Sequence, residues 1–222
     1  MTHRLLSEVL PDGSWGGCPC VLVGGGPSLA GFEWERLTGW RVIGVNRAFE
    51  KFDPTIIFSM DKRFVGWIEH GEYGQEALTA WRESKALKVC AVMPSAPGVP
   101  DYVYVVPLYR SYHQAHHVFT FTSAEGIGHG NNSGYGALNL AVCLKANPIY
   151  LLGYDMKHTN GKSHWHGGHP REQRESTVKS FTRDFVRASI PIKRAGFRVV
   201  NLNPDSGLKC FEFGKAEEVL RG

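Results

Sequence analysis

The sequence contains no apolar stretch long enough to cross a membrane. A spanning helix needs roughly 18 consecutive apolar residues, and no segment of the 222-residue chain approaches that length. Residues 1–10 also lack the apolar centre of a secretory signal peptide. These two absences predict a cytoplasmic protein without a membrane partner.

Paired cysteines are missing as well. The chain has five cysteines, an odd number at scattered positions, which argues against a disulfide framework and predicts reduced, mostly buried thiols. Cys18 and Cys20 form a Cys-x-Cys pair ahead of an apolar run, but no second cysteine pair completes a zinc site. We therefore expect these two thiols to pack in the core.

Neither sign of charge dominates the composition. Lys and Arg number 25 and Asp and Glu 21, a formal net charge of +4 that does not support a nucleic-acid partner but does not exclude one. Hydrophobic residues make up 42% and charged residues 21%, values typical of folded domains rather than disordered or fibrous chains. The length suits one hydrophobic core, so residues 1–222 are predicted to form a single domain.

Short apolar runs alternate with segments of helical periodicity. The runs have the length and composition of buried strands, at 20–23, 41–45, 55–60, 87–92, 102–106, 149–152 and 198–202. Helices are expected at 64–84, 133–145 and 173–195. This alternation predicts an α/β fold, a Rossmann-like and mostly parallel sheet flanked by helices. Two polar, histidine-containing segments have no regular pattern, at 111–130 and 157–171, and the first is expected to be mobile and near the site.

The first strand ends in a glycine-rich turn, Gly24, Gly25, Gly26, Pro27 and Ser28. The turn matches neither the Gly-x-Gly-x-x-Gly fingerprint nor a phosphate-binding loop with a following Lys-Ser or Lys-Thr. Glycines nevertheless let a ligand approach the backbone, and Ser28 at a helix start offers a hydroxyl and amides to an anionic group. The turn therefore predicts a nucleotide-type ligand, and a glycine-rich turn without any ligand is the alternative.

Other polar residues lie where neighbouring elements meet the same edge of the sheet. Asn46, Asp61 and Asp155 each follow a predicted strand, and Asn132, Ser133 and Gly134 open a predicted helix. In open parallel sheets, ligands bind outside the carboxyl ends of the strands. We expect these residues and the glycine-rich turn to line one site.

The same patches, in the same order, resemble those of bacterial sialyltransferases of glycosyltransferase family 42. They are the glycine-rich turn, Asn46, the segment 132–134, and the run 149–155 that ends in Gly-Tyr-Asp. The resemblance continues through the histidine-rich 163–169 to 200–206. The glycine-rich start and residues 53–61 also resemble the wider DUF115 group, which includes flagellin-modifying glycosyltransferases and a 6-hydroxymethyl-dihydropterin pyrophosphokinase.

The sialyltransferase resemblance implies a transferase that moves a sugar from a cytidine-nucleotide donor to a hydroxyl acceptor. The donor would lie along Gly25 and Gly26, with Asn46 and the segment 133–134 holding its sugar and phosphate groups. Asp155 would contact its ribose or base. The resemblance further implies that a loop histidine, His166 or His169, removes the proton from the acceptor hydroxyl. The family's tyrosines have no counterpart here, because Met156 follows Asp155.

Three alternatives and several details stay open at the level of sequence. Asp61 and Asp155 could hold Mg²⁺ against a triphosphate, as an ATP-dependent pyrophosphokinase of the pterin type requires. His164, His166 and His169 could instead hold Zn²⁺. The third possibility is a nucleotide-binding module without catalytic activity. The sequence leaves the sugar, the acceptor, the stereochemistry and the oligomeric state undetermined.

Overall fold

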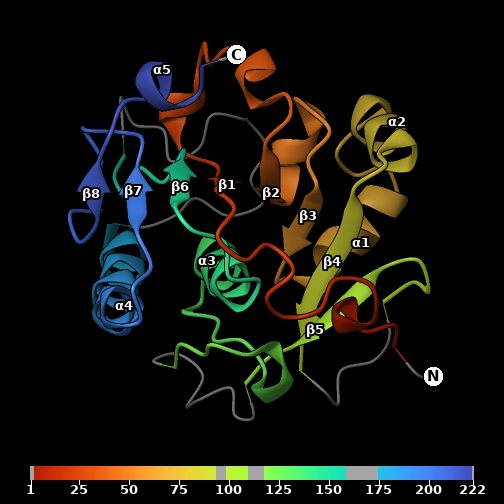
Figure 1. Cartoon of the computed structure of the whole chain (residues 1–222). Helices are drawn as coiled ribbons and strands as arrows, with labels where there is room; N and C mark the ends of the chain where they lie inside the picture. Colours follow the sequence, from red (N-terminus) through yellow and green to blue (C-terminus); the bar gives the residue numbers. More distant parts are fainter. Residues whose placement is uncertain (1–2, 94–98, 110–117, 159–174, 222) are drawn as a thin grey trace.

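Eight parallel strands form one sheet in the part of the chain that the structure describes. This structure, a computed structural model, describes residues 3–93, 99–109, 118–158 and 175–221 (Figure 1). The strands run in the order β5-β4-β3-β2-β1-β6-β7-β8. Their bounds are β1 Cys20–Val23, β2 Arg41–Val45, β3 Ile56–Ser59, β4 Leu87–Val92, β5 Tyr104–Pro107, β6 Ile149–Leu152, β7 Val199–Asn201 and β8 Glu212–Phe213.

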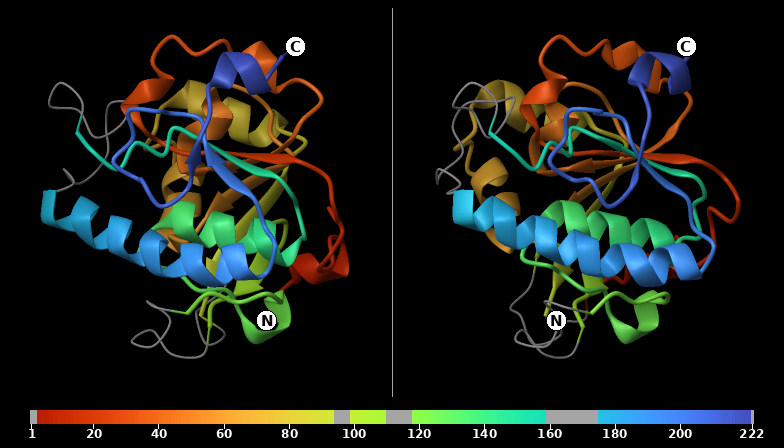
Figure 2. Two further views of the ribbon diagram at one scale, coloured as in Figure 1. Left: turned by 60° about the vertical axis from the view of Figure 1, so that its left-hand side comes forward. Right: turned by 90° about the vertical axis from the view of Figure 1, so that its left-hand side faces the viewer.

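Helices cover both faces of the sheet because the chain changes direction after β5. From β1 to β5 each strand is added on the same side, and right-handed crossovers then put every connection on one face. The return to β6 and β7 puts the next connections on the opposite face, where Figure 2 shows two helices, α3 and α4, side by side. The first face carries η2 Pro27–Leu29, η3 Trp34–Leu37, η4 Asn46–Glu50, α1 Lys62–Glu69 and α2 Gln75–Glu83; α3 is Ser133–Cys143 and α4 is Glu175–Arg194.

The buried strand residues divide between these two faces. Leu22, Ile43 and Phe58 pack with α3 and α4, whereas Val21 and Val42 pack with the short helices that follow β1. Parallel strands covered on both faces are continuous apolar runs, which explains the composition of β1, β2 and β3. The predicted Rossmann-like α/β fold is confirmed.

Helix α3 is buried along its length. Every residue from Gly134 to Cys143 is buried, and the helix contacts β1, β2 and β3. A Cβ atom at Gly136 would lie 2.4 Å from the sulfur of Met60, and one at Gly134 would lie 2.9 Å from the Tyr154 ring. The two glycines near the helix start are therefore required by close packing against neighbouring strand ends.

Several predicted elements differ from the structure in extent. The helix expected over 64–84 is two helices, α1 and α2, because the chain turns at Gly71 and Gly74, which have φ of 73° and 92°. The strand expected over 102–106 begins only at Tyr104, because a turn bonds the Val103 amide to the Pro100 carbonyl. The sheet also continues past 198–202 to β8, followed by α5 Ala216–Val219.

The described part of the segment expected to be mobile, 118–130, is anchored to α3 instead. The Asn139 side chain accepts a hydrogen bond from the Gly128 amide at 2.9 Å and donates one to the Thr120 carbonyl at 2.7 Å. Asn139 is fully buried and Ile127 is also at 0% exposure. This stretch also contains the short helix η5 Ser123–Glu125 and a β-bridge between Ile127 and Leu108, so the Asn139 side chain adds to the backbone bonds that hold it.

All five cysteines are free thiols, as predicted, and three of them are fully buried. Burial raises the pKa of Cys90 and of Cys143 to about 12, so both stay protonated at neutral pH. Within the described ranges, no helix combines the length and the apolar character that crossing a membrane requires.

The central position of α3 predicts a large cost for truncating its core side chains. Leu138 is fully buried, so Leu138→Ala should lower the free energy of unfolding by about 2–5 kcal/mol in urea titrations. The control Val186→Ala, at a helix position that is 45% exposed, should change it by about 0.5 kcal/mol or less. A similar small effect at Leu138 would contradict the packing of α3.

Candidate functional site

The order of strands in the sheet reverses at β1. The chain proceeds from β1 to β2 on one side, and β6 later pairs with β1 on the other. Ligands of doubly wound sheets bind at such a switch point, outside the carboxyl ends of the strands. The glycine-rich turn follows β1 and the segment 153–155 follows β6, so both lie at the switch point.

The loops that follow β1 and β6 are bonded to each other. The Gly24 amide donates to the Leu152 carbonyl and the Gly26 amide to the Gly153 carbonyl, each at 2.8 Å. A Cβ atom at Gly24 or at Gly26 would lie 2.6 Å from the Gly153 carbonyl oxygen. These two glycines are thus required by contact between loops, and ligand approach is not needed to explain them.

A buried carboxylate completes the connection between these loops. The Asp155 side chain accepts hydrogen bonds from the Ser28 amide at 2.7 Å, the Ser28 hydroxyl at 2.5 Å and the Asn203 side chain at 2.9 Å. Asp155 is only 3% exposed. We call Asp155, Ser28 and Asn203 the Asp155 latch. The Ser28 groups that the sequence assigns to an anionic ligand are used by the latch.

The latch also fixes the loop that follows β7. The Ser206 hydroxyl donates to the Tyr154 carbonyl at 2.7 Å, and the Gly207 amide donates to the Asp155 carbonyl at 2.7 Å. Three neighbouring strands, β1, β6 and β7, therefore have their carboxyl-end loops bonded together. The helix expected at Ser28 is only the three-residue η2, which lacks the aligned amides of a helix N-terminus.

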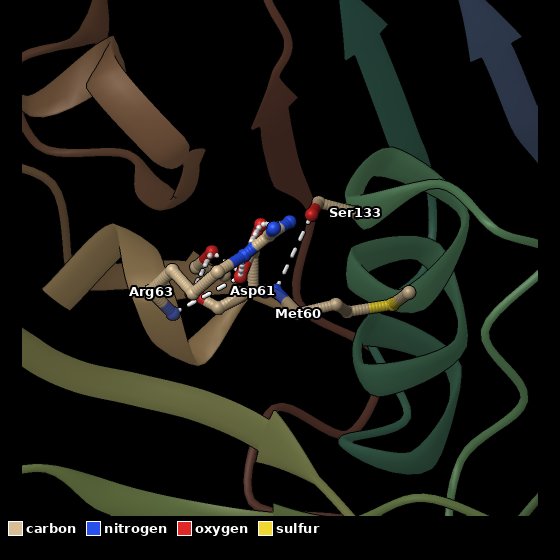
Figure 3. Close-up of polar contacts among 5 residues, drawn as sticks. Met60, Asp61, Arg63 and Ser133 are labelled. Carbon is tan, nitrogen blue, oxygen red and sulfur yellow. Dashed lines mark hydrogen bonds and ion pairs between the residues drawn. The ribbon is translucent and has the colours of Figure 1, made fainter. Parts of the chain in front are cut away.

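Across the sheet, beyond β1, the ends of β2 and β3 carry two further predicted site residues, Asn46 and Asp61. Asn46 is the first residue of η4, is half-buried, and has a φ of 51°. Asp61 caps α1 through the Arg63 amide and pairs with the Arg63 guanidinium at 2.6 Å (Figure 3). The Met60 amide donates to the Ser133 hydroxyl at 3.3 Å, which joins the end of β3 to the start of α3.

The N-terminus of α3 lies at this part of the edge. Asn132 caps the helix, since its side-chain oxygen accepts from the Tyr135 amide at 3.2 Å and its carbonyl accepts from the Gly136 amide. The amides of Ser133 and Gly134 have no acceptor among the described residues. The first amides of a helix favour anions, so this end of α3 has the chemistry of a phosphate-binding group.

Two polar residues of this region were missed by the sequence analysis. His129 is 2% exposed, and its Nδ1 accepts from the Asn131 amide at 3.0 Å, so a neutral imidazole carries its proton on Nε2. The sequence feature that could have identified His129 is its position, three residues before the asparagine that caps α3. Asn203 lies within the 200–206 patch, but its bond to Asp155 depends on the pairing of β6 with β7.

Non-glycine residues with positive φ also gather at the carboxyl edge. Asn46, Asn131 and Met156 have φ of 51°, 51° and 45°, and the fourth such residue described, Lys145, lies beyond the far end of α3. Positive φ is more costly for Met than for Asn. Strained backbone is enriched at functional sites. These three residues lie at the edge of the sheet where the strand order indicates a ligand site.

The two aspartates predicted as possible Mg²⁺ ligands do not come together. They follow β3 and β6, which have β2 and β1 between them, a separation of roughly 14 Å at the usual spacing of strands. Mg²⁺ binds oxygens at about 2.1 Å, so one ion does not bridge them. Both carboxylates also accept hydrogen bonds, Asp61 from Arg63 and Asp155 in its latch. Across the described ranges, no three His, Cys, Asp or Glu side chains gather to hold a metal.

The predicted catalytic histidines, His166 and His169, lie outside the described residues, as does His164 of the alternative zinc cluster. The described chain resumes at the start of α4.

No protein-family model and no curated protein matches this sequence. Among solved structures, the fold is similar to that of the Maf glycosyltransferase from Magnetospirillum magneticum AMB-1, with a TM-score of 0.56 and 15% sequence identity. The match covers 94% of this chain and 35% of that one, so this chain spans about a third of its neighbour's length. The likeness shows a shared fold.

The latch predicts that Asp155 contributes strongly to stability. Asp155→Ala would leave the Ser28 amide and the Asn203 side chain without acceptors, and we expect a loss of about 2–4 kcal/mol in the free energy of unfolding by urea titration. Asp205→Ala, at an exposed position two residues after Asn203, is the control and should cost about 0.5 kcal/mol or less. Equal effects of the two substitutions would contradict the latch.

Proposed function

We propose that residues 1–222 act as a single transferase domain that moves a sugar from a nucleotide-sugar donor, of the CMP-sugar type, to a hydroxyl acceptor. The observation that carries the proposal is the start of α3, where two helix amides without acceptors in the described chain lie at the carboxyl edge of a glycosyltransferase-like fold. The residue patches that resemble those of sialyltransferases of family 42 support the same activity.

In this proposal the donor phosphate binds at the start of α3. The amides of Ser133 and Gly134 donate to its oxygens, and the helix dipole favours its negative charge. Asn46, at the end of β2, binds the donor through its amide side chain. Gly25, the half-buried centre of the glycine-rich turn, supplies backbone contacts along the nucleotide.

Asp155 acts in this proposal as a positioning residue. Its carboxylate already accepts three hydrogen bonds and is almost fully buried, so it is poorly placed to contact a ribose. Through Ser28 it fixes the glycine-rich turn, and through Asn203 it fixes the loop after β7. The turn is thereby held as a rigid wall beside the donor.

The chemistry needs one base and one leaving group. His169 or His166 takes the proton from the acceptor hydroxyl, and the acceptor oxygen forms a bond to the anomeric carbon of the sugar. The bond between that carbon and the donor phosphate breaks, and the electron pair leaves with the nucleotide phosphate. The α3 amides stabilise the charge on that phosphate as it departs. No metal ion is required in this scheme.

A ligand panel tests the donor class. We expect nucleotide-sugars to raise the melting temperature without Mg²⁺, with CMP-sugars giving the largest shift, when CMP-, UDP- and GDP-sugars, ATP and free nucleotides are compared with and without Mg²⁺. A shift with ATP and Mg²⁺ alone would overturn the proposal in favour of a pyrophosphokinase. If no nucleotide raises the melting temperature, the proposed donor binding is wrong and only the similarity of fold remains.

Two histidine variants test catalysis separately from binding. We expect His169→Ala, or His166→Ala if that residue is the base, to lower nucleotide release from the donor by about 10²–10⁴-fold. The shift in melting temperature with donor should stay unchanged, because the base contacts the acceptor. His70→Ala, an exposed histidine at the end of α1, is the control. Full turnover in both variants would sink the proposed role of the loop histidines.

Substitutions at Asn46 separate a side-chain contact from a backbone effect. Glycine tolerates the positive φ at this position. If the amide side chain binds the donor, Asn46→Gly and Asn46→Ala should both raise the donor Kd by about five- to tenfold in calorimetry. Lys145→Ala, at a positive φ of 62° beyond the other end of α3, should leave the Kd unchanged. Wild-type affinity in Asn46→Gly would contradict a side-chain contact.

A further inference from the structure

Helix α4 carries most of the chain's excess of positive charge. It has five basic and two acidic side chains over Glu175–Arg194, whereas the whole chain has a net charge of +4. Helices α1 and α2 contain acidic and basic residues in nearly equal number. The positive charge is thus concentrated on one element.

The two acidic residues of α4 each pair with one of its five cations and leave an excess of three positive charges. Asp184 is 4% exposed and its carboxylate lies 3.7 Å from the Arg187 guanidinium. Glu175 lies in the first turn and pairs with Lys179 at 2.9 Å. Beyond the first turn, the charged residues exposed on α4 are therefore all basic.

Two large apolar residues are exposed among these cations. Val186 is 45% exposed and Ile190 53% exposed, and their four-residue spacing places them on one face of the helix. Lys179, Arg183 and Lys193 continue the same line at intervals of three or four residues. We call this set the α4 strip: Lys179, Arg183, Val186, Arg187, Ile190, Lys193 and Arg194. In the right-hand view of Figure 2, α4 lies in front of α3 along the outside of the molecule.

We propose that the α4 strip docks on an anionic lipid surface, with the helix lying parallel to it. Interfacial helices carry two kinds of side chain. Apolar side chains enter the boundary between headgroups and acyl chains, and flanking Lys and Arg side chains contact anionic headgroups. Long basic side chains also extend toward the headgroups while their alkyl parts stay in the apolar layer. The inference is independent of the proposed transferase activity.

The dimensions of the strip favour lipid over a protein partner. From Lys179 to Arg194 the helix spans about 22 Å and is roughly 10 Å wide. A stable protein interface buries about 800 Å² on each partner, several times this area. A second copy of the chain would also place like charges opposite one another. Binding to a lipid surface does not need an interface of that area, because the free energies of apolar insertion and of attraction to anionic headgroups add for each side chain.

The composition of the strip also argues against nucleic acid. Single-stranded nucleic acids bind through aromatic side chains that stack on the bases, and the strip has none. Duplex phosphates would engage the basic residues, but Val186 and Ile190 would gain nothing from that contact. The two exposed aliphatic side chains are explained by a partner with an apolar layer.

Sedimentation with vesicles tests this inference on the full chain. We expect the protein to partition onto vesicles of phosphatidylglycerol and phosphatidylcholine, and to bind phosphatidylcholine vesicles or either type in 1 M salt far less. The triple variant Lys179→Gln, Arg183→Gln, Lys193→Gln should bind on the order of a hundredfold more weakly, from about fivefold for each charge. Val186→Ser with Ile190→Ser should reduce binding by about tenfold.

A control variant tests whether the loss of vesicle binding is specific to α4. Val9→Ser with Lys85→Gln removes an apolar side chain that is 48% exposed and an exposed cation from outside α4, and should leave vesicle binding unchanged. Circular dichroism and the melting temperature are measured for each variant to check that it is folded. The inference is overturned if wild-type protein does not bind, if the control weakens binding equally, or if the serine variant binds like wild type. It is also overturned if Val186→Ser with Ile190→Ser instead abolishes self-association.

Discussion

A single buried carboxylate holds together the part of the molecule where the order of the strands reverses. Asp155 binds Ser28 after β1 and Asn203 after β7, while its own loop continues β6. Doubly wound sheets usually leave a crevice at this point because successive loops diverge to opposite faces. Here the loops are bonded together, and the proposed donor site lies beside them, at the glycine-rich turn, the end of β2 and the start of α3. The location of the proposed donor site depends on this constraint.

Helix α3 fixes the other side of that site. Because it is buried along its length, its N-terminal amides cannot shift without disturbing the core that it shares with β1, β2 and β3. Gly134 and Gly136 permit its start to approach Tyr154 and Met60, so the amides are held close to two strand ends. In the proposed function these rigidly held amides bind the donor phosphate without the cost of reorganisation.

Hydrophobic pattern was sufficient to predict the α/β class and seven of the eight strands of the described chain, but it missed β8. Apolar runs with glycine or polar residues at their ends are local signals, and β1, β2, β4 and β6 lie where they predict. Three features depend instead on strand order and on contacts between distant segments. They are the close packing at Gly24 and Gly26, the separation of Asp61 from Asp155, and the anchoring of residues 118–130. No local pattern contains those contacts. The exposure of Val186 and Ile190 also follows from how α4 packs, which no local pattern shows.

In the proposed function the donor binds through the start of α3, while the Asp155 latch keeps Ser28 from contacting it. Amide NMR spectra during titration with a CMP-sugar test this most directly. We expect the Ser133 and Gly134 amide resonances to move to lower field on binding, as new hydrogen bonds to phosphate require, while the Ser28 amide resonance stays near its position in the free protein. Large changes at Ser28 with none at Ser133 and Gly134 would contradict it.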